Sequence, residues 1–117
     1  MLTRPELQEI ANEIAADWWA ELRRHYHLPA AHPAIVLNGR LTRTLGRAWV
    51  DSNPQIIDLS VKNMLTNLNL YRSDIIAHEL AHIVAYNLFR DEGHGKAWKQ
   101  IMVTIGLTPR LSYSLLG

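Results

Sequence analysis

Two histidines and a glutamate in the second half of the chain have the spacing of a metal-centred hydrolytic site. His78-Glu79-Leu80-Ala81-His82 is an H-E-x-x-H pattern, in which one helical turn separates the two imidazoles. At about 100° per residue they lie about 40° apart around a helix, so both can reach one tetrahedral ion. Glu79 lies about 60° from His82, which is too far round for a ligand from the same turn. That direction suits a general base acting on a water molecule.

The segment that carries this pattern is apolar almost all round, which is typical of a buried helix. No Lys or Arg lies between Arg72 and Arg90, so Glu79 has no cationic partner within this segment. Burying an unpaired carboxylate costs several kcal/mol, whereas a metal with a polarised water would give the carboxylate a role. We therefore favour metal binding, and a hydrogen-bonded core cluster without a metal is the open alternative.

The absence of cysteine limits the ligands that such a site can have. With no cysteine in 117 residues, thiolate zinc sites, iron–sulfur clusters, disulfide scaffolds and cysteine nucleophiles are excluded. Any metal must be held by His, Asp or Glu. A metzincin pattern would need Gly and His where the chain has Ala85 and Leu88. No Asp or Glu follows Glu92, so a later helix cannot supply an acidic ligand.

His94 is the histidine that best fits the third ligand position of a catalytic zinc site. It lies twelve residues beyond His82, in a Gly-His-Gly sequence at the expected start of a helix. A turn through residues 90–93 would fold it back toward the first two ligands. The remaining histidines have no spacing that favours ligation, and they are rivals only by residue type: His25, His27 and His32.

The first half of the chain is expected to form one helix and a small sheet. Thr3 and Glu6 form a capping-box pattern, and apolar residues at helical spacing, Trp18 among them, predict a helix to about Tyr26. Three short β-prone runs separated by turn signals follow, and we expect them to pair as an antiparallel sheet: Ala34–Leu37, Leu45–Val50 and Ile56–Leu59.

Two further helices are expected around the candidate ligands. Ser73 and Asp74 are good helix-starting residues, so the motif helix is expected to begin there. The preceding stretch, Val61 to Leu70, is ambiguous. A last helix is predicted over about 95–105, with Gly106 at its C′ position. The order helix, strands, helix, helix predicts an α+β fold.

The H-E-x-x-H pattern and the Gly-His-Gly-Lys-Ala-Trp sequence at 93–98 together resemble the SprT-like metallopeptidases, a family that includes the DNA-dependent protease Spartan. The resemblance is specific over residues 45–107 and weaker in the first helix. It implies a zincin-like minimal domain with zinc on His78, His82 and His94 and with Glu79 as the catalytic acid/base. Trp98 matches the aromatic residue that follows the last ligand in that family.

The activity that this resemblance implies is that of a zinc metalloendopeptidase acting on protein or peptide substrates. Candidates for stabilising the oxyanion are several arginines and three tyrosines, Tyr71, Tyr86 and Tyr113. Longer members of the family carry a cysteine-bearing zinc ribbon. Because this chain has no cysteine, we expect one SprT-like domain over residues 1–117 without a ribbon.

The formal net charge of +1 hides a strongly basic stretch, since residues 22–50 carry five arginines and no acid. Arg40, Arg43, Arg47 and Trp49 are candidates for binding DNA, preferably single-stranded, through phosphate contacts and base stacking. An ordinary solvated basic face is the open alternative. A second set has the same residue types: Trp18, Trp19, Arg23 and Arg24.

Several functions stay open at this level. DNA binding would make DNA-associated or DNA-crosslinked proteins the substrates and DNA repair the process. A catalytically silent metal-binding module that recognises a protein or DNA partner is the main alternative, and a non-peptide hydrolase is a weaker one. The chain shows no leader-like start and no apolar run of about 18 residues. We therefore expect an intracellular monomer, cytoplasmic or nucleoid-associated, with no membrane partner.

Overall fold

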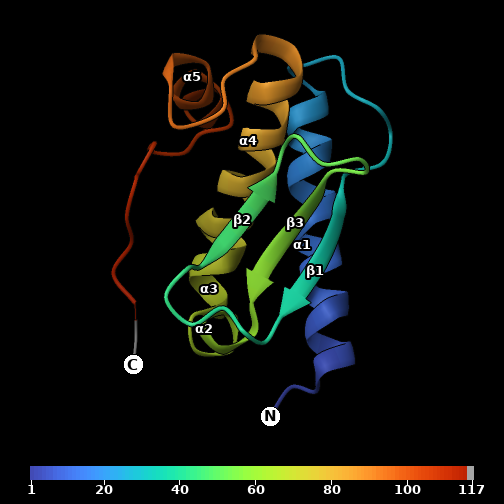
Figure 1. The fold of residues 1–117 in the computed structure, drawn as a ribbon, viewed down its shortest axis with the longest axis vertical. Helices are drawn as coiled ribbons and strands as arrows, with labels where there is room; N and C mark the ends of the chain where they lie inside the picture. Colours follow the sequence, from blue (N-terminus) through green and yellow to red (C-terminus); the bar gives the residue numbers. More distant parts are fainter. Residues whose placement is uncertain (116–117) are drawn as a thin grey trace.

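A long helix, a small sheet and a run of shorter helices follow one another in the computed structural model, which describes residues 1–115 (Figure 1). This order confirms the α+β class. The elements are α1 (Arg4–Arg23), β1 (Ala34–Asn38), β2 (Gly46–Trp49), β3 (Ile56–Ser60), α2 (Val61–Thr66), α3 (Leu68–Leu70), the π-helical turn η1 (Tyr71–Ile75), α4 (Ile76–Phe89) and α5 (Lys96–Thr104).

Helix α1 begins with the predicted capping box. The Thr3 hydroxyl accepts a hydrogen bond from the Glu6 backbone N–H, and the Glu6 carboxylate accepts one from the Thr3 backbone N–H. The helix ends at Arg23, earlier than the expected Tyr26. Its buried residues recur every three or four positions, and the buried tryptophan is Trp19 rather than Trp18.

The expected strands form, but their pairing differs from the prediction of an antiparallel sheet. The order is β1-β3-β2, with β3 parallel to β1 and antiparallel to β2. The physical reason is burial, because β3 is the most buried strand and a central strand gains a hydrogen-bonded partner on each edge. Residues 39–45 carry the chain from β1 to the far edge, and β3 then runs between the first two strands.

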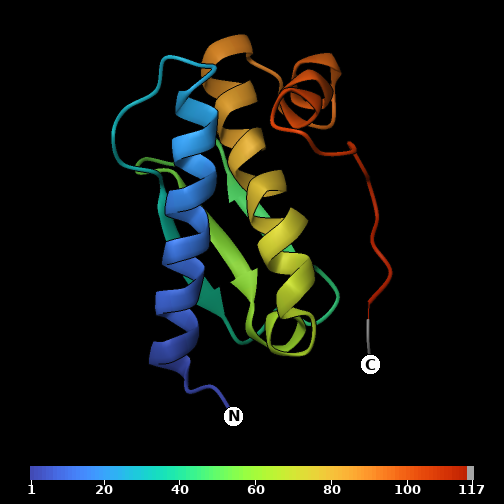
Figure 2. The same cartoon turned by 180° about the vertical axis from the view of Figure 1, so that it is seen from behind.

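Helices α1 and α4 lie side by side across one face of the sheet, as Figure 2 shows. Ile35, Ile57 and Leu59 are buried in the core that these helices share with the sheet. On the alternate positions, which face away from the helices, Arg47 and Trp49 of β2 are exposed. The site described below lies at the β2 side of this two-layer arrangement.

The ambiguous stretch before the motif helix is helical, and the predicted helix start at Ser73 and Asp74 is wrong. Both residues lie inside η1, which continues directly into α4. Tyr71 and Ile75 of this turn are buried, and the Tyr71 hydroxyl donates a 2.7 Å hydrogen bond to the Leu45 carbonyl. Tertiary packing therefore extends the helical segment beyond the local start signal.

The later helix boundaries agree with the sequence. Helix α4 ends at Phe89 because Arg90 adopts a left-handed conformation with φ 57°. Helix α5 ends before Gly106, whose φ of 89° favours glycine. No helix within residues 1–115 combines the length and apolar character needed to cross a bilayer.

Candidate metal centre

Three imidazole rings converge at the side of α4 that faces β2 and α5. The distances between their Nε2 atoms are 3.3 Å for His82–His78, 3.2 Å for His82–His94 and 3.1 Å for His94–His78. His78 is buried, His82 is half-buried and His94 is exposed, so the cluster opens toward solvent on one side. The structure thus brings together the three histidines predicted from the sequence.

This arrangement fits a tetrahedrally coordinated metal ion. Ligand nitrogens about 2.0–2.1 Å from a zinc ion are separated from one another by about 3.3–3.4 Å in a tetrahedron. The observed separations of 3.1–3.3 Å are close to that value. A neutral imidazole has one N–H donor and one acceptor nitrogen, so three mutually close Nε2 atoms cannot all be satisfied by one another. A cation between their lone pairs would satisfy all three.

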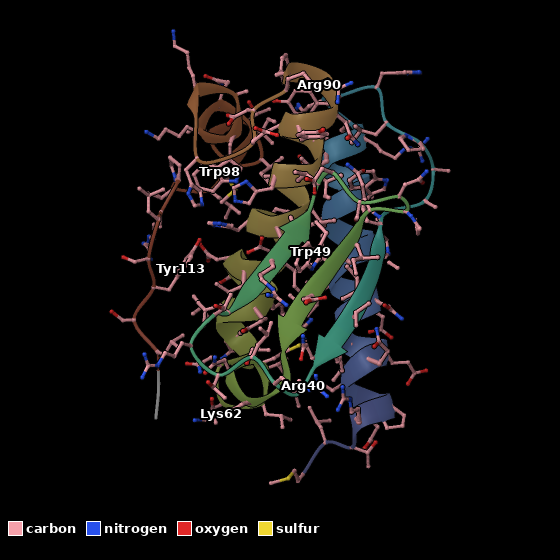
Figure 3. The ribbon with its side chains drawn as sticks, in the orientation of Figure 1. Arg40, Trp49, Lys62, Arg90, Trp98 and Tyr113 are labelled. Atoms are coloured by element: carbon pink, nitrogen blue, oxygen red, sulfur yellow. The ribbon has the colours of Figure 1, made fainter. Side chains whose placement is uncertain are left out.

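Trp98 of α5 packs against every ring of the cluster. Its ring stacks on His82 at a centroid distance of 5.3 Å and meets His78 and His94 edge-on at 4.7 and 4.5 Å. Its indole N–H donates to the His78 carbonyl at 3.2 Å, and the side chain is fully buried. Trp98 therefore restricts the rotamers of all three histidines and ties α5 to α4 (Figure 3).

Asp91 holds the loop that carries His94, a role that the sequence reasoning missed. Its carboxylate accepts hydrogen bonds from the backbone N–H groups of Gly93 (3.1 Å), Gly95 (3.3 Å) and Trp98 (3.0 Å). These bonds keep the pKa of Asp91 low, against the opposing effect of burial. A Cβ on Gly95 would come within 2.7 Å of this carboxylate. The sequence feature that could have indicated this role is an acidic residue that precedes a glycine at a helix start.

Burial keeps the clustered histidines neutral. It lowers the pKa of His78 to about 3 and that of His82 to about 4, and the like charge of the neighbouring imidazoles adds to both shifts. Burial also lowers the pKa of His94. Neutral imidazole is the form that coordinates a metal, so the cluster is ready for a cation at neutral pH.

Glu79 is buried beside the cluster without joining it. Its Oε2 atom lies 4.0 Å from His78 Nε2, and burial raises the pKa of Glu79 to about 8 in the metal-free protein. Gly46 of β2 allows the sheet to approach this side chain, because a Cβ there would lie 3.3 Å from Glu79 Cγ and 3.1 Å from the Asp58 carbonyl oxygen. A carboxylate so placed can exchange a proton with a molecule bound at the metal position.

Two cavities meet at Glu79 and His94. One, of about 380 Å³, also has His78, Arg43 and Tyr113 in its wall, and the other, of about 360 Å³, also has His82 and Trp49. The wall of each cavity includes part of β2. A ligand can therefore reach the cluster from two sides along this strand.

Residues 11–115 match the model of the SprT-like family. The chain belongs to this family. It is 34% identical over 86 residues to the Protein SprT of Salmonella newport (strain SL254) and to that of Salmonella heidelberg (strain SL476). These alignments cover 73% of the SprT-like chain but 48% of each relative, so the chain spans about half the length of the curated relatives it matches. No solved structure matches it.

The other histidines of the SprT-like chain lie outside the cluster. His25 pairs with Glu21 at 3.0 Å, and the His32 ring bonds the Pro33 carbonyl. His27 is exposed after α1. None of the three belongs to the group of residues 1–115 whose ligand atoms could share one metal ion.

The three candidate tyrosines of the SprT-like chain have different surroundings. Tyr71 is buried with its hydroxyl committed to the Leu45 carbonyl. The ring of Tyr86 lies under the Arg90 guanidinium, 5.1 Å from its centroid. Tyr113 has its hydroxyl 3.2 Å from His78 Nδ1. Burial and the negative charges of two acidic residues raise the pKa of Tyr113 to about 12, so its hydroxyl keeps its proton at neutral pH.

The predicted DNA-binding residues are all exposed, but they are not equivalent. Arg47 pairs with Asp58 at 2.7 Å and lies over the Trp49 ring at 4.8 Å. Burial would raise the pKa of Asp58, but its hydrogen bonds, that from Arg47 above all, lower it. Arg43 lies in the wall of the larger cavity, and Arg40 follows β1. Neither Arg40 nor Arg43 forms an ion pair within residues 1–115.

Proposed function

We propose that this chain is a zinc-dependent metalloendopeptidase of the SprT-like type, with His78, His82 and His94 as ligands and Glu79 as the acid/base. The observation that supports it most directly is the convergence of three neutral imidazoles beside a buried carboxylate at the junction of two cavities. Three nitrogen donors with a further position open to solvent are the ligand set of a catalytic zinc site.

Zinc bound there would polarise a peptide carbonyl and acidify a water molecule. Glu79 would take a proton from a water molecule beside it as the water oxygen bonds to the carbonyl carbon. It then gives the proton to the amide nitrogen as the carbon–nitrogen bond breaks. The distance of 4.0 Å between Glu79 Oε2 and His78 Nε2 supports this role, because one carboxylate is then beside the proposed zinc position for both proton transfers.

The position of β2 supports a peptide as the substrate. This strand is at the edge of the sheet, pairing with β3 on one side, and it has residues in the walls of both cavities. An extended peptide can add to such an edge through main-chain hydrogen bonds, which are independent of its sequence. The scissile bond would then lie near Glu79, with side chains entering the cavity on either side.

Proteins associated with or crosslinked to DNA are the substrates that we propose for this activity. Arg43 is exposed in the wall of the larger cavity, Arg40 is exposed after β1, and Trp49 offers an exposed ring for base stacking. Arg47 contributes less, because Asp58 already neutralises it. Single-stranded DNA passing over these residues would bring an attached protein to the cleft.

The substitution Glu79→Gln tests the activity. The variant should bind zinc like the parent, near one ion per chain, because its amide does not remove a ligand. Its hydrolysis of casein or of the chain itself should fall by about 10²–10⁴-fold, the contribution of a general acid–base group. Metal analysis and cleavage assays with and without single-stranded DNA measure both properties.

Each of the other outcomes of that experiment contradicts a different part of the proposal. A Glu79→Gln variant that cleaves like the parent would show that another group is the base. Zinc bound by both proteins without cleavage by either would favour the silent metal-binding module. A parent that binds no zinc would contradict the proposed centre itself.

A further inference from the structure

The segment after α5 returns to the histidine cluster and contacts it through Tyr113. Residues 107–115 run beside α4 on the β2 side of the molecule, and Figure 3 shows Tyr113 on this segment. Tyr113 is half-buried, whereas Ser112 and Ser114 on either side of it are exposed. Its hydroxyl is 3.2 Å from His78 Nδ1, and the two ring centroids are 5.9 Å apart. The segment is thus attached to the most buried imidazole of the cluster.

The place of this contact on the imidazole ring limits what Tyr113 can do. Nδ1 and Nε2 are at separate edges of the ring, and Nε2 is the atom that approaches His82 and His94, at 3.3 and 3.1 Å. A cation shared by the three Nε2 atoms would therefore lie on the side of His78 that faces away from the Tyr113 hydroxyl. Tyr113 can act on such a cation only through His78.

The direction of the hydrogen bond follows from the metal position. A metal on the Nε2 lone pair leaves the ring proton of neutral His78 on Nδ1, so that Nδ1–H donates and the Tyr113 oxygen accepts. The other tautomer has its proton on Nε2 and no lone pair there for a cation. An acceptor at Nδ1 therefore favours the one tautomer that can be a ligand, and it also fixes the rotation of the ring.

The other neighbours of His78 cannot take this role. Trp98 packs against the ring, but an indole N–H is only a donor, and it is bound to the His78 carbonyl at 3.2 Å. Glu79 Oε2 lies 4.0 Å from Nε2, which is the other ring nitrogen. Within residues 1–115, Tyr113 is the hydrogen-bond partner that the structure gives to His78 Nδ1.

We infer that Tyr113 is a positioning residue of the proposed zinc centre: its hydroxyl accepts a hydrogen bond from His78 Nδ1–H and so holds this ligand in the tautomer and orientation that zinc needs. Because coupling between two contacts is reciprocal, zinc on His78 should in turn hold residues 107–115 against α4. This inference rests on the zinc site of the proposed function and does not require the peptidase reaction.

The zinc affinity of Tyr113→Phe tests this role, since Phe keeps the ring and removes only the hydroxyl. Loss of the hydrogen-bond partner should weaken zinc binding by about 10–100-fold in competition with a chromophoric chelator. Tyr26→Phe is the matched control, because Tyr26 lines a cavity with Phe89 that includes none of the three clustered histidines, and it should bind zinc like the parent. Parent affinity in Tyr113→Phe overturns the inference, and a loss confined to Tyr113→Leu would assign the effect to ring packing.

Hydrogen exchange separates this hydrogen bond from a general effect on folding. In zinc-loaded protein with ¹⁵N-labelled histidine, the His78 Nδ1 proton should exchange with water about fivefold faster in Tyr113→Phe than in the parent, the factor that corresponds to one ordinary hydrogen bond. Zinc should also slow backbone amide exchange in residues 110–115 of the parent more than in Tyr113→Phe. Equal exchange in parent and variant at either place overturns the inference.

The same measurements distinguish this inference from the proposed function. A parent that binds zinc and cleaves no peptide would contradict the peptidase and leave the role of Tyr113 standing on the affinity and exchange data. A parent that binds zinc no better than Tyr113→Phe would contradict the role of Tyr113 alone. A parent that binds no zinc would contradict the metal centre and the role of Tyr113 together.

Discussion

At the scale of single residues, Asp91 shows how a side chain outside the histidine cluster fixes the position of His94, the proposed third ligand. The turn between α4 and α5 must place His94 within 3.2 Å of His82, and no side chain of the N-cap residue Gly95 can cap α5. The Asp91 carboxylate takes over this capping through three backbone N–H groups. The position of His94 therefore depends on one acid outside the H-E-x-x-H pattern.

Replacing Asp91 with Ala should lower zinc affinity by about 10–100-fold, because the loop that positions His94 loses its hydrogen bonds. Competition with a chromophoric chelator measures the affinity. Glu92→Ala removes the same charge from the next residue, which is exposed and forms no hydrogen bond or ion pair recorded within residues 1–115. Equal losses of zinc affinity in Asp91→Ala and Glu92→Ala would show that the removed charge, and not loop geometry, is responsible.

At the scale of elements, the link between β1 and β2 decides which basic side chains come near the metal centre. Residues 39–45 cross to the far edge of the sheet, and β2 then lies against α4. This path brings Arg43 into the wall of the larger cavity, whereas Arg47, inside the strand, pairs with Asp58 across to β3. A stretch that is uniformly basic in sequence is thus divided into free and neutralised charges.

The double substitution Arg40→Ala with Arg43→Ala should weaken binding to single-stranded DNA and reduce its salt dependence. Each lost phosphate contact lowers the slope of log K against log salt by about 0.7. Fluorescence anisotropy from about 50 to 200 mM salt measures the slope. Lys96→Ala with Lys99→Ala, two exposed charges on α5, is the charge-matched control. Identical slopes in the two double variants would contradict a local DNA site.

At the scale of the whole molecule, the metal centre joins elements that are distant in sequence. The cluster takes ligands from α4 and from the α4–α5 turn, and it packs on α5 through Trp98. A cation bound there would stabilise only the folded chain, because the unfolded chain has no preformed site. The free energy of unfolding should therefore depend on both metal and pH.

The metal-free protein should be most stable near pH 6.5. Below the ordinary value of 6.5, the unfolded chain takes up protons at His78 and His82, whose folded pKa values are about 3 and 4, so stability falls as pH falls. The folded chain instead keeps a proton on Glu79, whose pKa rises from 4.5 to about 8, so stability also falls as pH rises from 6.5 toward 8. Below pH 6.5 the two histidines together change the free energy of unfolding more than Glu79, which has the opposite effect.

Thermal melts of chelator-treated protein between about pH 5 and 8 measure this profile, where each shifted group contributes about 1.4 kcal/mol per pH unit. Zinc at a thousandfold excess over its Kd should add about 4 kcal/mol to the free energy of unfolding at pH 7. A metal-free protein whose melting temperature is flat over this range would contradict the pKa shifts. Equal melting temperatures with and without zinc would contradict the metal centre.

The sequence determined the features that depend on neighbours along the chain. Helical spacing brought His78, Glu79 and His82 to one side of a helix, and the left-handed Arg90 ends that helix where the polar turn begins. The absence of cysteine and of later acids left His94 as the third ligand candidate. The three histidines converge as predicted, because helix periodicity and termination are local.

The tertiary structure decided everything that depends on pairing across the chain. Strand order is non-local, so turn signals alone suggested an antiparallel sheet where β3 is parallel to β1. Burial of Tyr71 moved the helical segment ahead of Ser73. Asp91 and Tyr113 acquire their roles only when the α4–α5 turn and the last segment fold against α4. Residue type and spacing therefore predicted which histidines converge, and packing selected the groups that orient them.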